Sequence, residues 1–135
     1  MNVFEALFSA LSNSTSVTAF SSQRIFPIVA PESAKTPFVT IHQISNIPFH
    51  AMESDADISE YRIQISSWTT DFSGVVSLST AIKGVLRDYS GILGSSNFRV
   101  QRIFLDSEYD FPEINLETNK INYHRAQDYL VWTTG

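Results

Sequence analysis

Cysteine is absent from the 135 residues of this chain. Its absence excludes disulfide bonds, thiolate nucleophiles, and zinc or iron-sulfur sites built on cysteine. Uninterrupted apolar stretches are short, and none approaches the roughly 20 residues that a membrane-spanning helix needs. The opening residues 1–8 are apolar, but they lack the basic start of a secretory signal and contain Glu5. These features predict a soluble protein that does not enter a membrane.

Basic residues are also scarce. Nine Lys and Arg stand against 14 Asp and Glu, which gives a formal net charge of -5 at pH 7. The basic residues are dispersed along the chain, whereas a protein that binds nucleic acid on its own usually carries a clustered basic face. The composition therefore argues against autonomous nucleic-acid binding.

Apolar side chains are plentiful by contrast. Hydrophobic residues make up 43% of the chain and aromatic residues 13%, including ten Phe. A chain of this length suits one domain, and this apolar content is enough for a core without a metal or a cofactor. We expect a single domain over residues 1–135 with no cofactor.

Two helices are predicted from apolar residues at helical spacing. The first covers residues 2–12, with a short helical turn after it at 17–22. The second covers residues 72–89, begins at Asp71 as its N-cap, and is stopped by Gly91 and Gly94.

Four strands are predicted from β-branched and aromatic residues that alternate with polar ones. They cover residues 38–45, 59–69, 98–105 with a bulge near 102–104, and 123–133. The intervening segments 24–37, 46–58 and 106–113 contain proline or several acidic residues and are expected to be irregular connections. The order helix, two strands, helix, two strands predicts an α+β fold, an antiparallel four-stranded sheet with the two main helices packed on one face.

Side chains with catalytic or ligand-binding chemistry form no convincing pattern. His42, His50 and His124 lack the spacing of metal or acid-base sites, although His42 and His124 could meet on neighbouring strands. The acidic stretch 53–60 lacks the turn glycine of a calcium loop. The segment 91–96 has no Lys after its glycines, and no serine lies in a nucleophile elbow. We therefore predict no catalytic, cofactor or metal site and a protein that is not an enzyme.

Candidate residues for protein contacts fall into two groups. Large apolar and acidic side chains in the two long connections are typical of partner contacts where they stay exposed, although such loops also fold back over a core; they are Phe49, Met52, Asp55, Asp57, Tyr109 and Phe111. Arg62, Gln64, Arg125 and Gln127 lie on strands and are expected to share one polar sheet face, which either meets a neighbouring subunit or is simply solvated. Trp68 and Trp132 are expected to plug the core at strand ends.

Several short motifs follow one another in a characteristic order. They are Arg24-Ile25-Phe26-Pro27, then Pro37-Phe38-Val39-Thr40, then a strand with Arg62-Ile63-Gln64 that ends in Trp68, and finally Asp128-Tyr129-Leu130-Val131-Trp132. In this order the chain resembles the tail completion, or tail terminator, proteins of long-tailed bacteriophages, over most of its length.

The resemblance implies a structural assembly protein. Members of that family form a homohexameric ring at the head-proximal end of the tail, stop growth of the tail tube, and provide the surface that joins the head. The implied partners are other copies of the chain, the tail tube protein and a head-completion or neck protein. Genome DNA would pass through the channel without specific binding, and the protein would be found in the virion tail and, during assembly, in the host cytoplasm. The alternatives are another phage neck protein, such as a head completion or stopper protein, or a small α+β enzyme or ligand-binding domain that uses His42, His124 and the acidic stretch 53–60.

Overall fold

The computed structural model describes residues 3–21, 24–28, 37–50, 55–93, 98–115 and 120–134. For residues 49–50, 55–57, 98, 112–115, 120–122 and 134 it describes the backbone only. The elements follow one another as α1 (Val3–Ser12), α2 (Thr15–Ser21), β1 (Ile25–Pro27), β2 (Phe38–His50), β3 (Asp55–Thr69), α3 (Phe72–Leu86), β4 (Gly91–Leu93), β5 (Phe98–Asn115) and β6 (Lys120–Thr134).

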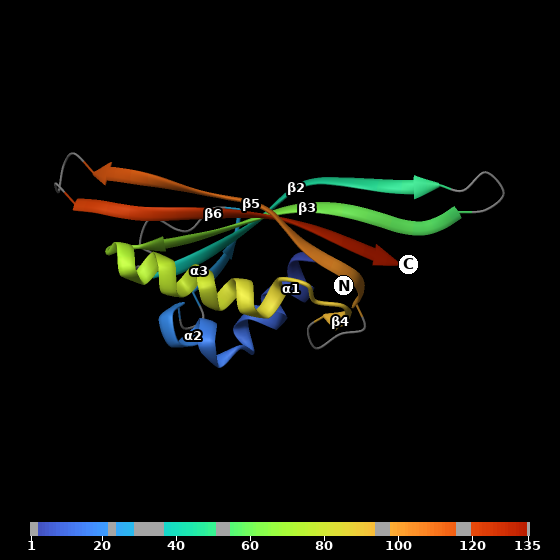
Figure 1. Cartoon of the computed structure of the whole chain (residues 1–135), viewed down its shortest axis with the longest axis horizontal. Helices are drawn as coiled ribbons and strands as arrows, with labels where there is room; N and C mark the ends of the chain where they lie inside the picture. Colours follow the sequence, from blue (N-terminus) through green and yellow to red (C-terminus); the bar gives the residue numbers. More distant parts are fainter. Residues whose placement is uncertain are drawn as a thin grey trace.

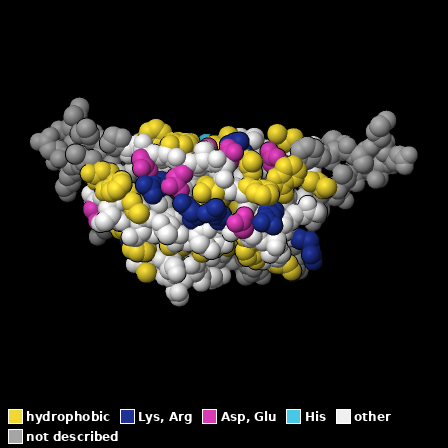
Figure 2. All heavy atoms as spheres, viewed as in Figure 1, with side chains coloured by type: hydrophobic (Ala, Val, Ile, Leu, Met, Phe, Trp, Pro, Cys, Tyr) yellow, Lys and Arg dark blue, Asp and Glu magenta, His cyan; other side chains and the backbone are white. Residues whose placement is uncertain are grey.

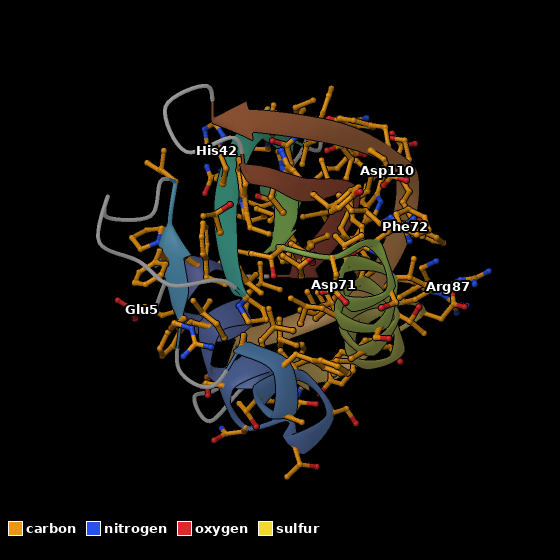
Figure 3. All side chains as sticks on the ribbon, turned by 90° about the vertical axis from the view of Figure 1, so that its left-hand side faces the viewer. Glu5, His42, Asp71, Phe72, Arg87 and Asp110 are labelled. Atoms are coloured by element: carbon orange, nitrogen blue, oxygen red, sulfur yellow. The ribbon has the colours of Figure 1, made fainter. Side chains whose placement is uncertain are left out.

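The described strands form one six-stranded sheet in the order β1-β2-β3-β6-β5-β4. β1 pairs with β2 in parallel, and the other neighbours are antiparallel. The helices lie together on one face of the sheet, and the other face carries no helix (Figure 1). Viewed from its end, the sheet curls around the helices (Figure 3).

The α+β class and the placement of helices on one face agree with the prediction, but the four-stranded antiparallel sheet is wrong. The sheet is mixed and has six strands, and there are three helices among the described residues. β1 lies in the segment 24–37 that was expected to be irregular, where Pro27 ends a three-residue edge strand. Its missing amide hydrogen costs little there, because an edge position needs fewer ladder bonds.

The two long connections are also strands in the structure. β2 continues to His50 and β3 starts at Asp55, while β5 continues to Asn115. The β2–β3 and β5–β6 hairpins therefore extend beyond the helices in opposite directions (Figure 1). The predicted loops 46–58 and 106–113 are mostly these hairpins, and the expected bulge near Arg102 is confirmed as a register shift between Val100 and Arg102.

The core lies between the helices and one face of the sheet. The apolar stripes of α1 and α3 are buried against alternating residues of the central strands; the members include Leu7, Leu11, Leu78, Ile82, Leu86, Ile63, Ile65, Ile103, Tyr129 and Val131. α3 begins at the predicted Asp71, but that side chain accepts a hydrogen bond from Ser73 Oγ and makes no capping bond. The helix ends at Leu86, before the predicted glycines, and Asp88 follows in the left-handed region with φ 61°.

Candidate protein interface

Four aromatic rings lie side by side on the face of the sheet that the helices leave uncovered. Phe38, Trp68, His124 and Phe111 occupy matching positions on β2, β3, β6 and β5. The ring centroids of Phe38 and Trp68 are 5.6 Å apart and those of Trp68 and His124 are 3.8 Å apart, with nearly parallel planes. Phe111 is tilted against His124 at 5.4 Å. We call these four residues the aromatic row.

The aromatic row follows from register. Opposite residues in neighbouring strands point to the same side of the sheet, so one ring from each strand suffices to build a row. Two residues further along β2, and at the aligned positions of β3 and β6, the same face carries the small side chains Thr40, Ser66 and Ala126. These leave room for Tyr109 of β5, whose ring meets Phe111 at 5.2 Å in an edge-to-face contact.

A polar band crosses the same face beside the aromatic row. Its members are Arg62, Gln64, Asp106, Ser107, Tyr109 and Asp128. Gln64 Nε2 donates to Tyr109 Oη at 2.5 Å and to Asp128 Oδ1 at 3.3 Å, and Arg62 donates to Asp106 at 2.9 Å. The hydrogen bond to Asp106 raises the pKa of Arg62. The band is thus internally paired, and it links β3, β6 and β5.

Arg125 and Gln127 do not join Arg62 and Gln64 on one face, so that prediction is wrong. Gln64 is paired with Asp128, which places the odd-numbered residues of β6 on the opposite side of the sheet. Arg125 and Gln127 face α3, where Arg125 Nη1 donates to Ser79 Oγ at 3.2 Å and Gln127 Nε2 donates to the Ser79 carbonyl oxygen at 3.2 Å. Both residues hold the sheet to a helix.

An ion-pair cluster surrounds Arg125. Its guanidinium donates to both carboxylate oxygens of Asp110, at 2.6 and 3.0 Å, and lies 3.6 Å from Glu108. Glu108 also pairs with Lys83 of α3 at 3.1 Å. The hydrogen bond from Arg125 lowers the pKa of Asp110. At Glu108 burial acts to raise the pKa, but hydrogen bonds from Gln127 and Lys83 lower it overall. The cluster fixes the base of the β5–β6 hairpin against α3.

An apolar hollow of about 180 Å³ lies where α3 begins, at the base of the same hairpin. Phe72 and Phe111 stand at its margin with 54% and 45% of their surface exposed. Tyr123 meets Phe72 edge to face at 5.9 Å, and Val75 is buried in the lining. Among the described residues of the lining, Asp110 alone is an acid, and it is neutralised by Arg125.

The two histidines proposed as an alternative site lie apart. His124 is aligned with Trp68 and Phe38, whereas His42 is aligned with Gln64. The two rows are about 13 Å apart along the strands, and β3 lies between the histidines. Figure 3 shows His42 on the other side of the curled sheet from Asp110, which precedes Phe111, the residue paired with His124. Among the described residues no group of His, Asp or Glu has a geometry that could hold a metal ion.

The remaining predicted contact residues divide into two sets. Tyr109 and Phe111 lie on β5 with 37% and 45% of their surface exposed, as a contact role requires. Met52 and the side chains of Phe49, Asp55 and Asp57 lie outside the described residues. The two tryptophans are half-buried on the uncovered face rather than inside the core.

The aromatic row and the exposed position of Phe72 were not predicted from the sequence. Trp68 was expected to plug the core and His124 to meet His42 at most, and only the register shows that both align with Phe38. A signal for Phe72 was present, since a large apolar residue directly after a helix N-cap stands at the start of the helix, where the core does not reach.

No described helix combines the length and apolarity that crossing a bilayer demands. No curated protein matches the chain. Among solved structures, a chain from the virion of a native gene transfer agent particle has the same fold, with a TM-score of 0.77 and 12% sequence identity over 98% of this chain and 95% of that chain.

The sequence profile of the family described as "Tail completion protein gp17" matches residues 5–133. This match includes every strand pair of the uncovered face and all three helices, except for two residues at the start of α1 and one at the end of β6. Because the profile spans nearly the whole chain, the protein belongs to the tail completion protein gp17 family and is a structural protein of the bacteriophage tail.

Proposed function

We propose that the protein is a tail terminator, which forms a ring of six copies on the head-proximal end of the tail tube. The ring stops polymerisation of the tube and provides the surface that joins the head. Family membership supports a role in completing the tail, and the two unlike free edges of the sheet support a ring.

The free edges are the observation that carries this proposal. β1 pairs with residues 39–41 of β2 alone, and β4 pairs with residues 98–100 of β5 alone. Residues 42–48 and 104–111 therefore have no strand on their outer side in the described part of the chain, whereas Ile103 is hydrogen-bonded there to the backbone of Asp88 and Tyr89. An unpaired edge presents amide and carbonyl groups to another chain. Two unlike edges that meet form a heterologous contact, which closes into a ring when the rotation permits.

Capping follows from the two faces of such a ring. One face reproduces the contacts that a tail tube subunit offers to the ring below it. The opposite face lacks them and meets a head-completion or neck protein instead. Growth of the tube stops because no template for another tube subunit remains.

DNA that passes through the ring would slide without being held. Few phosphates can be neutralised by a chain of net charge -5, so counterion release would contribute little to binding. Lys and Arg side chains on the face in Figure 2 are interspersed with Asp and Glu, and they form no continuous basic stripe there. Duplex binding by the purified protein at physiological salt would contradict this part of the proposal.

The solution mass tests the ring. We expect light scattering over a wide concentration range, with and without Mg²⁺, to give a mass near six subunits of 15.2 kDa. Ile47→Lys, on the free edge of β2, should lower that mass, whereas Phe20→Lys on α2 should not. Both wild-type residues are partly exposed, at 49% and 38%, so neither change buries a charge in the core.

Addition to growing tail tubes tests the cap. The protein should stop elongation of purified tubes when it is added at one ring per tube end. Tubes that elongate at an unchanged rate while the protein binds portal rings would favour the head-completion alternative. A persistent monomer that neither caps tubes nor binds portals would contradict a terminator role.

A further inference from the structure

Ile28 is the most unusual exposed residue of the chain. Its φ is 63°, in the left-handed region that β-branched residues rarely adopt. Its side chain is nevertheless 67% exposed, more than any other large apolar side chain among the described residues. The Ile28 amide donates to the Ile41 carbonyl oxygen at 2.9 Å, which holds the residue just after β1. A strained and exposed apolar side chain is typical of a functional contact.

A second, mostly apolar hollow is lined in part by Ile28 itself, with His42 and Gln43 as its polar members. It has a volume of about 220 Å³ and is lined by residues of α1, β1, β2 and β3, including Phe4, Pro27 and Ile41. The edge of the sheet at β1 and β2 therefore has a projecting apolar side chain beside an apolar hollow.

The opposite edge, at β5 and the start of α3, has the same two features. Phe72 and Phe111 project there, beside the hollow of about 180 Å³ described above. Each edge thus combines a projecting apolar side chain with a hollow, so the projecting side chains of one edge match the hollow of the other. This complementarity between opposite edges of one chain is what a heterologous contact between identical subunits requires.

We propose that Ile28 of one copy enters the hollow beside Phe72 in the next copy, and that Phe72 and Phe111 of that copy lie in the hollow beside Ile28. The occupant of each hollow is therefore a second copy of this chain. The inference rests on the proposed ring, because it assigns the side chains that join neighbouring subunits in it.

The contact cannot form within one chain. β1 is three strand positions from β6 and four from β5, which places the two edges about 14 to 19 Å apart along the sheet. Figure 3 shows β1 on one side of the curled sheet and Phe72 on the other. A disulfide needs Cα atoms closer than about 7 Å, so a bond between these edges reports two chains.

The absence of cysteine makes cross-linking a clean test. In the variant Ile28→Cys Phe72→Cys, mild oxidation should give a ladder of covalent dimers to hexamers on a denaturing gel, because each subunit reacts with two neighbours. Either single substitution should give no ladder. The matched control Ile28→Cys Ile92→Cys also carries two cysteines at exposed positions, with Ile92 46% exposed on β4, and should give none.

Ile28→Gly separates a contact role from a structural one. Glycine adopts a positive φ without strain, so the thermal midpoint of the monomer should stay the same or rise. The protomer concentration at half-assembly should rise at least tenfold, as expected when a large apolar side chain no longer becomes buried. A structural role would lower the thermal midpoint instead.

The outcomes distinguish the inference from the proposed function. A ring of six copies that gives no ladder, and that assembles equally well with Ile28→Gly, would overturn the contact and leave the terminator role intact. A protein that stays monomeric and forms no cross-links, even on tube ends, would overturn both. A bond within one chain, seen as a monomer of altered mobility, would overturn the separation of the two edges.

Discussion

The imidazole ring of His124 lies parallel to the indole of Trp68, with ring centroids 3.8 Å apart and an angle of 11° between the planes. Phe111 covers His124 from the other side. The Nε2 atom is buried and has no hydrogen-bond partner among the described residues. Burial lowers the pKa of His124, and the nearby Asp110 opposes this only in part.

Stability should therefore depend on pH through His124. The folded pKa lies below the unfolded value of about 6.5, so in that window the unfolded chain binds more protons. The free energy of unfolding should fall as the pH drops below about 6.5, and this part should be absent in His124→Phe, which keeps the ring stack. Melting curves between pH 7.5 and 5 measure the effect.

His42→Gln is the control for this experiment, since His42 lies in a different row of the same face. Equal loss of pH dependence in the two variants would contradict the assignment to His124. The carboxylates of Glu108 and Asp110 should not interfere, because their lowered pKa values place their titration at more acidic pH.

Arg125 should be the most costly charged residue to remove. Arg125→Met leaves the carboxylates of Asp110 and Glu108 close together without the guanidinium that they share. The Arg125 side chain is only 14% exposed, so little water can replace it. We expect the free energy of unfolding to fall by about 2 kcal/mol. Arg87→Met, which removes a 61% exposed side chain, should change it by less than about 0.5 kcal/mol. Similar losses in urea denaturation of the two variants would show that the cluster does not anchor the hairpin.

Two glycines should respond in opposite directions to alanine. Gly84 is exposed in the last turn of α3, and an added Cβ would meet no atom within 4 Å, so Gly84→Ala should raise stability by about 0.5 kcal/mol. Gly91 has φ +116°, which alanine adopts only with strain, so Gly91→Ala should lower stability by about 1 to 2 kcal/mol. Chemical denaturation of both variants measures the difference, and a gain at Gly91 would contradict the backbone geometry.

Tyr109 and Phe111 should matter more for assembly than for folding. Both are partly exposed, so Tyr109→Ser Phe111→Ser should keep a cooperative melting transition, with a loss of about 1 to 2 kcal/mol from the edge-to-face and stacking contacts. Attachment of the protein to tail tubes or to the ring should be lost. The corresponding change of Phe49 and Met52 to Ser remains a prediction of the same kind. Loss of cooperative melting in either variant would place its residues in the core.

Periodicity predicted the helices and the central parts of four strands, because their apolar faces are buried on one side only. It missed the hairpins because Pro48 and Pro112 looked like loop residues. Both prolines lie where their strand has a partner on one side alone, so the missing amide hydrogen breaks no ladder bond there. Acidic residues such as Asp106 and Asp110 also favoured a loop, and the arginines that neutralise them come from other strands.

Side-chain faces were harder to predict than elements. Arg62 and Gln64 were correctly placed on the face away from the core, but Arg125 and Gln127 were assigned to the same face. The difference is a shift of one residue in the register of β6, which moves a side chain to the other side of the sheet. Register is set by contacts between distant residues, and a single sequence carries no direct record of them.

The position of β6 bears on how the polypeptide acquires its structure during synthesis. β6 is the last strand in the chain order, yet it lies between β3 and β5 and pairs with both along most of its length. Until residues 120–134 leave the ribosome, the earlier strands have no common neighbour, and the β2–β3 pair and the β4–β5 pair remain unconnected. Nascent chains that lack this strand should expose apolar surface and be sensitive to proteases, and the subunit becomes competent to assemble only in one late, cooperative step.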